Sequence, residues 1–450
     1  MPIRAAVIGL GIAGVGFHVP LILSLQPLFT LAYVVDTSAP PELENGTFAD
    51  KFGTGTQYLA RLEDVLTKED VDLIVVATPT ATHYNFAKSA LEAGKHVLLD
   101  KPVTVSYSEA QSLGVIAKQR NRVLYAFQNR RWDSDYLTLQ QLIRQGRLGN
   151  ITDYESHYDR YRNFLKGSWK ESAIPGGGQF YSLGPHLIDQ ALKCFGRPDK
   201  VTAFIKNIRG TGDPKVDDDF TVILHYLPTR SKLHTTTATL RGHLLSARKP
   251  QLRFIVRGSK ATYSKYGFDA QEGQMQHDGH RAFNREDFGV EPEELWGTLE
   301  TAFDDKGNDV RSEVVPSIRG SYQELYRNLA DVIETGAEPA VKWEEAELTM
   351  LITELAIQSS QEERTVTVPS LSTPTLSPVE SNEADLRRVL EVPDTGEKSS
   401  GSSAASTDSP PSSIPSTPSL TSPKRSMASL SPSNSAWFLN LFHRHRGEAT

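Results

Sequence analysis

The chain has 450 residues, of which 38% are hydrophobic and 23% charged, so most of it can bury a core. Its formal net charge of −7 shows no basic excess, which argues against direct nucleic-acid binding. Cys194 is the single cysteine, so no internal disulfide can form, and a reducing cytoplasmic compartment is expected, with the nucleus as an alternative. The N-terminus lacks a signal-peptide pattern, and no apolar stretch approaches the ~18 residues of a transmembrane helix.

Residues 1–128 alternate between strand and helix patterns. Helices are expected after the first strand, to about Leu25, and over His83–Ala93, which Gly94 closes. Because strands alternate with helices, the pattern predicts a doubly wound parallel sheet. The expected strands are Ala5–Gly9, Leu31–Val35, Val71–Ala77, His96–Leu99 and Val123–Phe127.

The pattern changes at about Asn129 and predicts a second α/β domain over residues 129–369. A helix is expected over Ser134–Gln145, and helical patterns return at Ser321–Thr335 and Trp343–Glu362. Between them lie longer alternating strands with few helices, which favours an open antiparallel sheet. These strands are Thr152–Tyr158, Val201–Asn207, Phe220–Tyr226, Leu233–Leu240 and Leu252–Arg257.

The composition changes again near Pro369, and residues 370–450 are predicted to be a disordered tail. Of the last 80 residues, 35 are Ser, Thr or Pro, and such a segment buries too little apolar surface to order itself. A tail of this kind favours a eukaryotic source. Ser422-Pro-Lys-Arg is either a site for a proline-directed kinase or a chance match, and the aromatic and basic residues of 437–446 form either a docking segment or nothing specific. Removal of the tail is expected to leave cofactor affinity unchanged.

A glycine motif marks a cofactor site at the N-terminus. Gly9-Leu-Gly11-Ile12-Ala13-Gly14 matches G-x-G-x-x-G, follows the first strand and opens a helix, where free N–H groups favour phosphates. Asp36 ends the second strand, 22 residues after Gly14, where an acid can bind the adenosine ribose. The arrangement predicts a Rossmann domain that binds a nicotinamide dinucleotide. NAD is favoured over NADP, because the carboxylate repels a 2′-phosphate, although Thr37 and Ser38 could bind one.

Several segments in chain order resemble the Gfo/Idh/MocA oxidoreductase family. They include Thr78-Pro79 followed by Thr82-His83, Glu92-Ala-Gly-Lys-His-Val, and the triplet Asp100-Lys101-Pro102. Further segments, among them Arg130-Arg-Trp-Asp and Gly184-Pro-His-Leu, resemble the scyllo-inositol dehydrogenase-like branch. The likeness runs from about Ile3 to Pro369. It implies an NAD(P)-dependent dehydrogenase or reductase acting on a secondary alcohol or carbonyl of a sugar, inositol or related polyol.

The resemblance also assigns residues to the site. Lys101, just beyond the fourth strand, would supply or relay the base for a hydroxyl proton, and His186, expected to begin a helix, would shuttle protons. The turn residues Thr78, Pro79, His83 and Asp100 would line the cofactor site. Tyr158, Arg160, Trp169, Tyr181 and Asp189 are candidate substrate residues, and ordinary packing explains each of them at least as well. Asp189, three residues after His186, could also orient the imidazole or simply pack the helix. No metal-ligand spacing is present, and homodimers or homotetramers are implied.

One position departs from the family pattern. The family has an Asp four residues before the histidine, and this chain has Ser182 there. A serine can hydrogen-bond a substrate hydroxyl but carries no charge near neutral pH. Either Ser182 serves an altered substrate, or catalysis is weak or absent and the protein is a cofactor-binding sensor.

Overall fold

The computed structural model describes residues 1–37, 48–229 and 233–370. The predicted tail therefore lies, apart from Ser370, outside the described residues. No helix among the described residues is long and apolar enough to cross a membrane.

The N-terminal part is a six-stranded parallel sheet in the order β3-β2-β1-β4-β5-β6. Apart from the partly exposed edge strand β3, its strands are mostly apolar and buried, as expected where helices cover a parallel sheet. The strands are β1 Ile3–Ile8, β2 Phe29–Val35, β3 Gln57–Leu59, β4 Leu73–Val76, β5 His96–Leu99 and β6 Leu124–Ala126. The helices are α1 Val19–Ser24, α2 Phe48–Phe52, α3 Leu62–Leu66, α4 His83–Glu92 and α5 Tyr107–Arg120, which a capping box of Ser106 and Glu109 begins. The predicted doubly wound sheet is confirmed.

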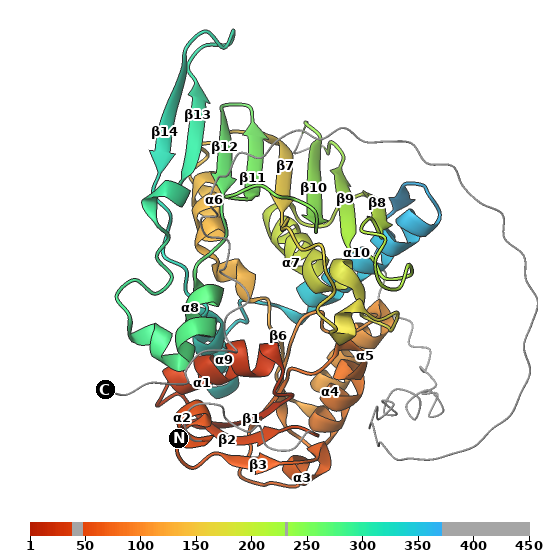
Figure 1. The fold of residues 1–450 in the computed structure, drawn as a ribbon, viewed down its shortest axis with the longest axis vertical. Coiled ribbons are helices and arrows are strands. Elements are labelled where there is room, and N and C mark those ends of the chain that lie inside the picture. The colour runs from red at the N-terminus through yellow and green to blue at the C-terminus, as the bar shows by residue number, and fades with distance from the viewer. Residues whose placement is uncertain (38–47, 230–232, 371–450) are drawn as a thin grey trace, which may run out of the picture. The chain divides into compact units, whose positions relative to one another are not determined.

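The second sheet has nine strands in the order β14-β13-β12-β11-β7-β10-β9-β8-β15 among the described residues. Helices cover one face, and on the other face side chains alternate toward solvent, so the sheet is open as predicted (Figure 1). The strands are β7 Ile151–His157, β8 Lys200–Lys206, β9 Asp219–Tyr226, β10 Thr236–His243, β11 Leu252–Gly258, β12 Ala261–Tyr266, β13 Gly297–Ala302, β14 Val310–Val315 and β15 Val366–Thr367. The helices are α6 Ser134–Arg144, α7 Gly178–Phe195, α8 Gln271–Asp278, α9 Gln323–Thr335 and α10 Trp343–Gln361.

The second sheet is mixed, not purely antiparallel. β7 lies between β10 and β11 and pairs in parallel with β10, whereas the other strand pairs of this sheet among the described residues are antiparallel. The chain leaves β7 through a long connection that contains the 18-residue helix α7, and such a crossover permits a parallel neighbour. The sequence pattern placed the start of this helix too late, at His186, because the helix begins at glycine and contains Gly184 and Pro185, both poor helix formers.

The cores of the two sheets meet through the C-terminal helices. Leu325, Leu329 and Ala330 of α9 join the buried cluster of the parallel sheet, and so does Met350 of α10. Further along α10, Ile352 and Ala356 belong to the cluster beneath the mixed sheet. One helix thus packs into both cores, and this continuity fixes the carboxyl edge of the parallel sheet against α7.

Candidate active site

The glycine loop after β1 is shaped by close contacts of its own backbone. Gly9 has φ +91°, and a Cβ there would lie 2.6 Å from the Ala77 carbonyl oxygen. A Cβ on Gly14 would lie 1.9 Å from the Gly9 carbonyl oxygen. Both positions therefore require glycine. The turn closes and the helix packs against it as the motif predicts.

Gly11 is different, because a Cβ there would have no atom within 4 Å. The helix begins at the next two residues, Ile12 and Ala13, and Ile12 is 74% exposed. An open glycine and an exposed apolar side chain at a helix N-terminus form a cradle that a dinucleotide fits. Backbone N–H groups there can bind its pyrophosphate.

Asp36 follows β2 and lies against this loop. Its carboxylate Oδ2 accepts a hydrogen bond from the Leu10 N–H at 2.7 Å. The hydroxyl of Tyr58 donates to the Asp36 carbonyl oxygen at 2.6 Å. The acid is thus held at the edge where the ribose of a bound dinucleotide would lie; Thr37 follows it, and Ser38 lies outside the described residues.

The turn after β4 is tied to the turn after β5. The Thr78 and Thr82 hydroxyls lie 2.7 Å apart beside Pro79. His83 is 1% exposed, and its Nδ1 and Nε2 each lie 2.8 Å from a backbone carbonyl oxygen, of Pro102 and Thr78 respectively. His83 thus holds together the two turns that would line the cofactor site, and its own contact with the cofactor stays a prediction.

Lys101 lies on the second of these turns, and its bond to Pro102 is cis. The Asp100 carboxylate accepts the Lys101 backbone N–H at 2.8 Å. The Lys101 Nζ donates to the carbonyl oxygen of Ser182 at 2.9 Å, so the side chain spans from the parallel sheet to α7. Burial, and then the nearby Lys170 ammonium, lower the pKa of Lys101 to about 7.

His186 shares a face of α7 with Ser182, one turn earlier. It lies in the middle of the helix, not at its start as expected, because α7 already begins at Gly178. The side chain is 3% exposed, its Nδ1 is buried without a hydrogen-bond partner among the described residues, and the ring of Tyr158 meets it edge-on at 6.3 Å. Burial, followed by the Lys101 charge, holds the pKa of His186 well below its usual range, so the imidazole is neutral at pH 7.

Asp189 does not face this group. Its two carboxylate oxygens accept from Arg131 Nε at 2.8 Å and Nη2 at 2.6 Å, and both side chains are buried. Arg131 also contacts Glu345 of α10 at 2.7 Å. Predicted as a substrate residue, Asp189 is instead half of a bidentate ion pair that fixes α7 to its neighbours.

The other predicted substrate residues divide into two groups. Tyr158 is buried with its hydroxyl bound to Asp133 at 3.0 Å, and the Tyr181 hydroxyl donates to the Val105 carbonyl oxygen at 3.0 Å. Their polar ends are thus occupied by the protein. Arg160 is exposed and Trp169 half-buried, on the connection between β7 and α7. These two remain accessible to a ligand.

Three charged residues near Lys101 were missed by sequence reasoning. Lys170 Nζ lies 3.4 Å from the Ser182 hydroxyl, and Arg130 forms an ion pair with Glu272 at 2.5 Å. Arg130 stands in a segment that carried the family resemblance, which was the available signal for it. Lys170 follows Trp169 in a segment without such a signal.

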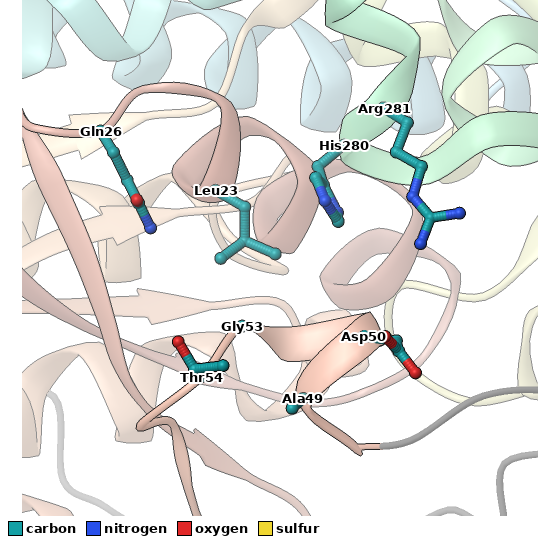
Figure 2. A pocket seen from close by; sticks show the side chains of 8 residues that line it. All are labelled: Leu23, Gln26, Ala49, Asp50, Gly53, Thr54, His280 and Arg281. Atoms are coloured by element: carbon teal, nitrogen blue, oxygen red, sulfur yellow. The ribbon is translucent and has the colours of Figure 1, made fainter.

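A separate pocket of about 400 Å³ lies between α1, α2 and the short helix Gly279–Asn284 (Figure 2). Figure 2 shows His280 and Arg281 on one side of it and Asp50 on the other. It contains none of the candidate cofactor or catalytic residues, so the cluster around Lys101 is a different site.

Comparison with known proteins agrees with this geometry. The profile of the oxidoreductase family's NAD-binding Rossmann fold matches residues 3–128, and that of its C-terminal alpha/beta domain matches residues 140–368. The chain belongs to the Gfo/Idh/MocA oxidoreductase family. Both the recognised family and the fold class are thereby confirmed.

Relatives of this family match over nearly their full length. An uncharacterised oxidoreductase of Schizosaccharomyces pombe is 34% identical over 80% of this chain and 98% of its own. The scyllo-inositol 2-dehydrogenase (NADP(+)) IolW of Bacillus subtilis is 32% identical over 81% of this chain and 95% of its own. The solved structure of the oxidoreductase YvaA from Bacillus subtilis superposes with a TM-score of 0.74 at 30% identity, covering 82% of this chain and 98% of that one.

Proposed function

We propose that this oxidoreductase is a dehydrogenase or reductase that acts on a secondary alcohol or carbonyl of a sugar, inositol or related polyol. The observation that carries the proposal is the position of Lys101 at the carboxyl edge of the parallel sheet. Its Nζ donates a hydrogen bond at 2.9 Å to the carbonyl oxygen of Ser182 on α7, the helix that also carries the neutral His186. Ligands of doubly wound sheets bind at this edge. The similarity to a scyllo-inositol dehydrogenase supports a polyol as substrate.

The cofactor would be NAD or NADP, with NAD favoured by Asp36. When bound, the nicotinamide supplies the hydride acceptor or donor. The residues that would hold it are Gly11, Ile12 and Ala13 through the helix N-terminus, Asp36 toward the ribose, and the turn of Thr78 and Pro79 along the sheet edge. The NADP preference in the name of the Bacillus subtilis relative makes cofactor choice a direct experimental question.

The protein's own chemistry is a proton transfer at Lys101. With a pKa of about 7, Lys101 Nζ is deprotonated in part of the molecules at neutral pH and can take the proton from a substrate hydroxyl. In the reductive direction the ammonium returns that proton to the oxygen. The neutral His186 ring can hydrogen-bond the same oxygen or relay the proton, and Ser182 can orient a second hydroxyl.

A cofactor-binding sensor with weak or no turnover is the second candidate. It is favoured by one observation: among the hydrogen bonds of the described residues, Lys101 Nζ meets a backbone carbonyl and no carboxylate. A carboxylate partner would stabilise the ammonium that forms when Lys101 takes a proton from the substrate, and this stabilisation is missing here. This candidate predicts binding of NAD(H) without turnover.

The decisive assay follows NAD and NADP reduction spectrophotometrically over a panel of polyols and aldoses. Lys101→Ala should abolish turnover of an active substrate, whereas Lys306→Ala on the exposed β13–β14 hairpin is the matched control and should not. Equal rates for wild type and Lys101→Ala would remove Lys101 from the mechanism. Absence of turnover over the whole panel, with NADH still bound, would favour the sensor; if Ser182→Asp then raised turnover, the missing carboxylate would be the limiting group.

The roles of the domains follow the two sheets. We propose residues 1–128 as the cofactor domain, residues 129–369 as the substrate and oligomerisation domain, and residues 370–450 as a separate tail. The open face of the mixed sheet offers the surface for a homodimer or homotetramer. Sedimentation analysis of the full chain tests this arrangement.

A further inference from the structure

Two lysines converge on Ser182. Lys101 Nζ binds its carbonyl oxygen at 2.9 Å, and Lys170 Nζ lies 3.4 Å from its hydroxyl. The two ammonium groups therefore approach one another across a single residue. Ser182 carries no charge, so it compensates neither of them.

Further cations lie on the same connection between β7 and α7. The Arg160 guanidinium has no hydrogen bond or ion pair to any described residue, and Lys166 likewise has none through its side chain. Burial is the main cause that lowers the pKa of Lys166 and of Lys170. Arg162, Arg160 and Lys170 lower the pKa of Lys166 further. Arg160 also lowers the pKa of Lys170, against the opposing attraction of Asp100 and Glu272. These charges therefore influence one another.

The nearby carboxylates have other partners. Glu272 forms its ion pair with Arg130. Glu171 lies 3.3 Å from Arg162 and also accepts the backbone N–H groups of Lys166 and Gly167. Among the hydrogen bonds and ion pairs of the described residues, none joins the side chain of Lys101, Lys170 or Arg160 to a carboxylate. Asp100 and Glu272 raise the pKa of Lys170 through longer-range attraction, without a direct contact.

Unfilled donors accompany this surplus of positive charge. Arg130 Nε and Arg162 Nε are buried N–H donors without a hydrogen-bond partner among the described residues. His186 Nδ1, a donor or an acceptor according to its tautomer, has none either, and two buried acceptors, Asp159 Oδ1 and Glu171 Oε1, are likewise without a hydrogen bond to any described residue. Like charges that lie close together, and buried donors without an acceptor, destabilise the folded protein unless a ligand supplies the missing countercharge and acceptors. A neutral polyol would supply acceptors but no countercharge.

We propose that the substrate carries an oxyanion, a carboxylate or a phosphate, that Lys170 and Arg160 bind while Lys101 and His186 act on its hydroxyl or carbonyl. This inference rests on the proposed function, since it names the substrate class of the same site. A guanidinium suits bidentate binding of either oxyanion, and an ammonium suits a single strong contact. A sugar acid or a sugar phosphate is the class of molecule that this arrangement fits.

The test compares matched substrates that differ in charge. D-Glucose is set against D-glucuronate and D-glucose 6-phosphate, and myo-inositol against inositol 1-phosphate. Turnover is followed with NAD and NADP, and affinity is measured by calorimetry on the full chain saturated with NADH. The charged member of at least one pair should bind about tenfold or more tightly than its neutral partner, and this advantage should shrink as NaCl is raised.

Variants test which residues give the charged substrates their higher affinity. Lys170→Met and Arg160→Gln should each reduce the charged-to-neutral ratio of affinities by about tenfold, as expected for loss of one charge-assisted hydrogen bond. Lys306→Met, which removes an exposed lysine far from this connection in sequence, should leave the ratio unchanged.

The outcomes separate the two proposals. A charged compound that binds tightly through Lys170 without turnover would keep this inference and count against the dehydrogenase. Turnover of neutral polyols, with charged partners binding no more tightly, would keep the dehydrogenase and overturn this inference. Charged compounds that bind no better than neutral ones in every pair overturn it whatever the turnover.

Discussion

The charge of Lys170 should set the pH range in which Lys101 works. Lys101 has its pKa lowered from 10.5 to about 7, first by burial and second by Lys170. Replacing Lys170 by methionine removes the repulsion and keeps most of the apolar stem. The pKa of Lys101 should then rise, because its ammonium form no longer meets a like charge.

The size of this rise can be worked from Coulomb's law. At an effective dielectric constant of about 20, two unit charges roughly 8 to 10 Å apart repel by about 2 kcal/mol. Since 1.36 kcal/mol corresponds to one pKa unit, the pKa of Lys101 should rise by about 1 to 1.5. Burial remains, so the value stays below 10.5.

The assay is the pH profile of kcat/KM between pH 5 and 10. In the oxidative direction Lys101 must be neutral to accept a proton, so kcat/KM should fall as the pH drops below the pKa of Lys101. This fall is the acid limb of the profile, and Lys170→Met should move it to higher pH. In the reductive direction the ammonium must donate, so the rate should fall above the pKa, and the variant should extend activity to higher pH. Lys170→Arg keeps the charge and serves as the control.

Two results would refute the reasoning. An acid limb that stays in place in Lys170→Met would show that Lys170 does not set the pKa of the group that limits the rate. A limb that moves equally in Lys170→Met and Lys170→Arg would assign the effect to packing and not to charge. A neutral substrate should be used here, so that loss of oxyanion binding does not alter the profile.

Three further predictions test the remaining assignments. Asp36→Ser should shift the ratio of kcat/KM for NAD over NADP by tenfold or more toward NADP, and an unchanged ratio would show that this carboxylate does not face the ribose. Gly11→Val should abolish NADH binding, measured by fluorescence, and should change Tm little because the new Cβ meets no protein atom. Gly14→Ala should lower Tm because its Cβ would collide with the loop. Arg131→Ala should destabilise the fold by about 3 to 5 kcal/mol in urea unfolding, since it leaves Asp189 buried and unpaired, and a change in KM without loss of stability would restore Asp189 as a substrate residue.

The parallel sheet and its glycine loop were predictable because their signals are local. Gly14 is required by a contact within the loop, and the G-x-G-x-x-G pattern marks Gly9 as well, although the contact that requires Gly9 is with Ala77 after β4. The apolar runs of β1 and β4 are continuous because both faces of the sheet are covered. The open second sheet was also predictable from alternation along β9 and β10. These features depend on a few neighbouring residues, which the sequence displays directly.

The helix α7 and the partners of its side chains were not predictable in this way. Gly184 and Pro185 weaken the helix signal, and tertiary packing against the mixed sheet overrides it. Asp189 looks like a partner for His186 at a spacing of three residues, yet its true partner Arg131 lies 58 residues earlier in the chain. Periodicity cannot decide between such partners, because it carries no information on long-range contacts.

The serine at position 182 acquires a meaning only from these long-range contacts. In the sequence it is a missing carboxylate, which points toward weak catalysis. In the structure its carbonyl binds Lys101 and its hydroxyl lies beside Lys170, so a carboxylate there would form an ion pair with these lysines and raise the pKa of Lys101. A serine leaves both charges to the ligand and keeps Lys101 able to accept a proton near neutral pH. The serine that stands in place of the family's aspartate therefore removes a carboxylate partner of the lysines and, by the same change, favours an anionic substrate.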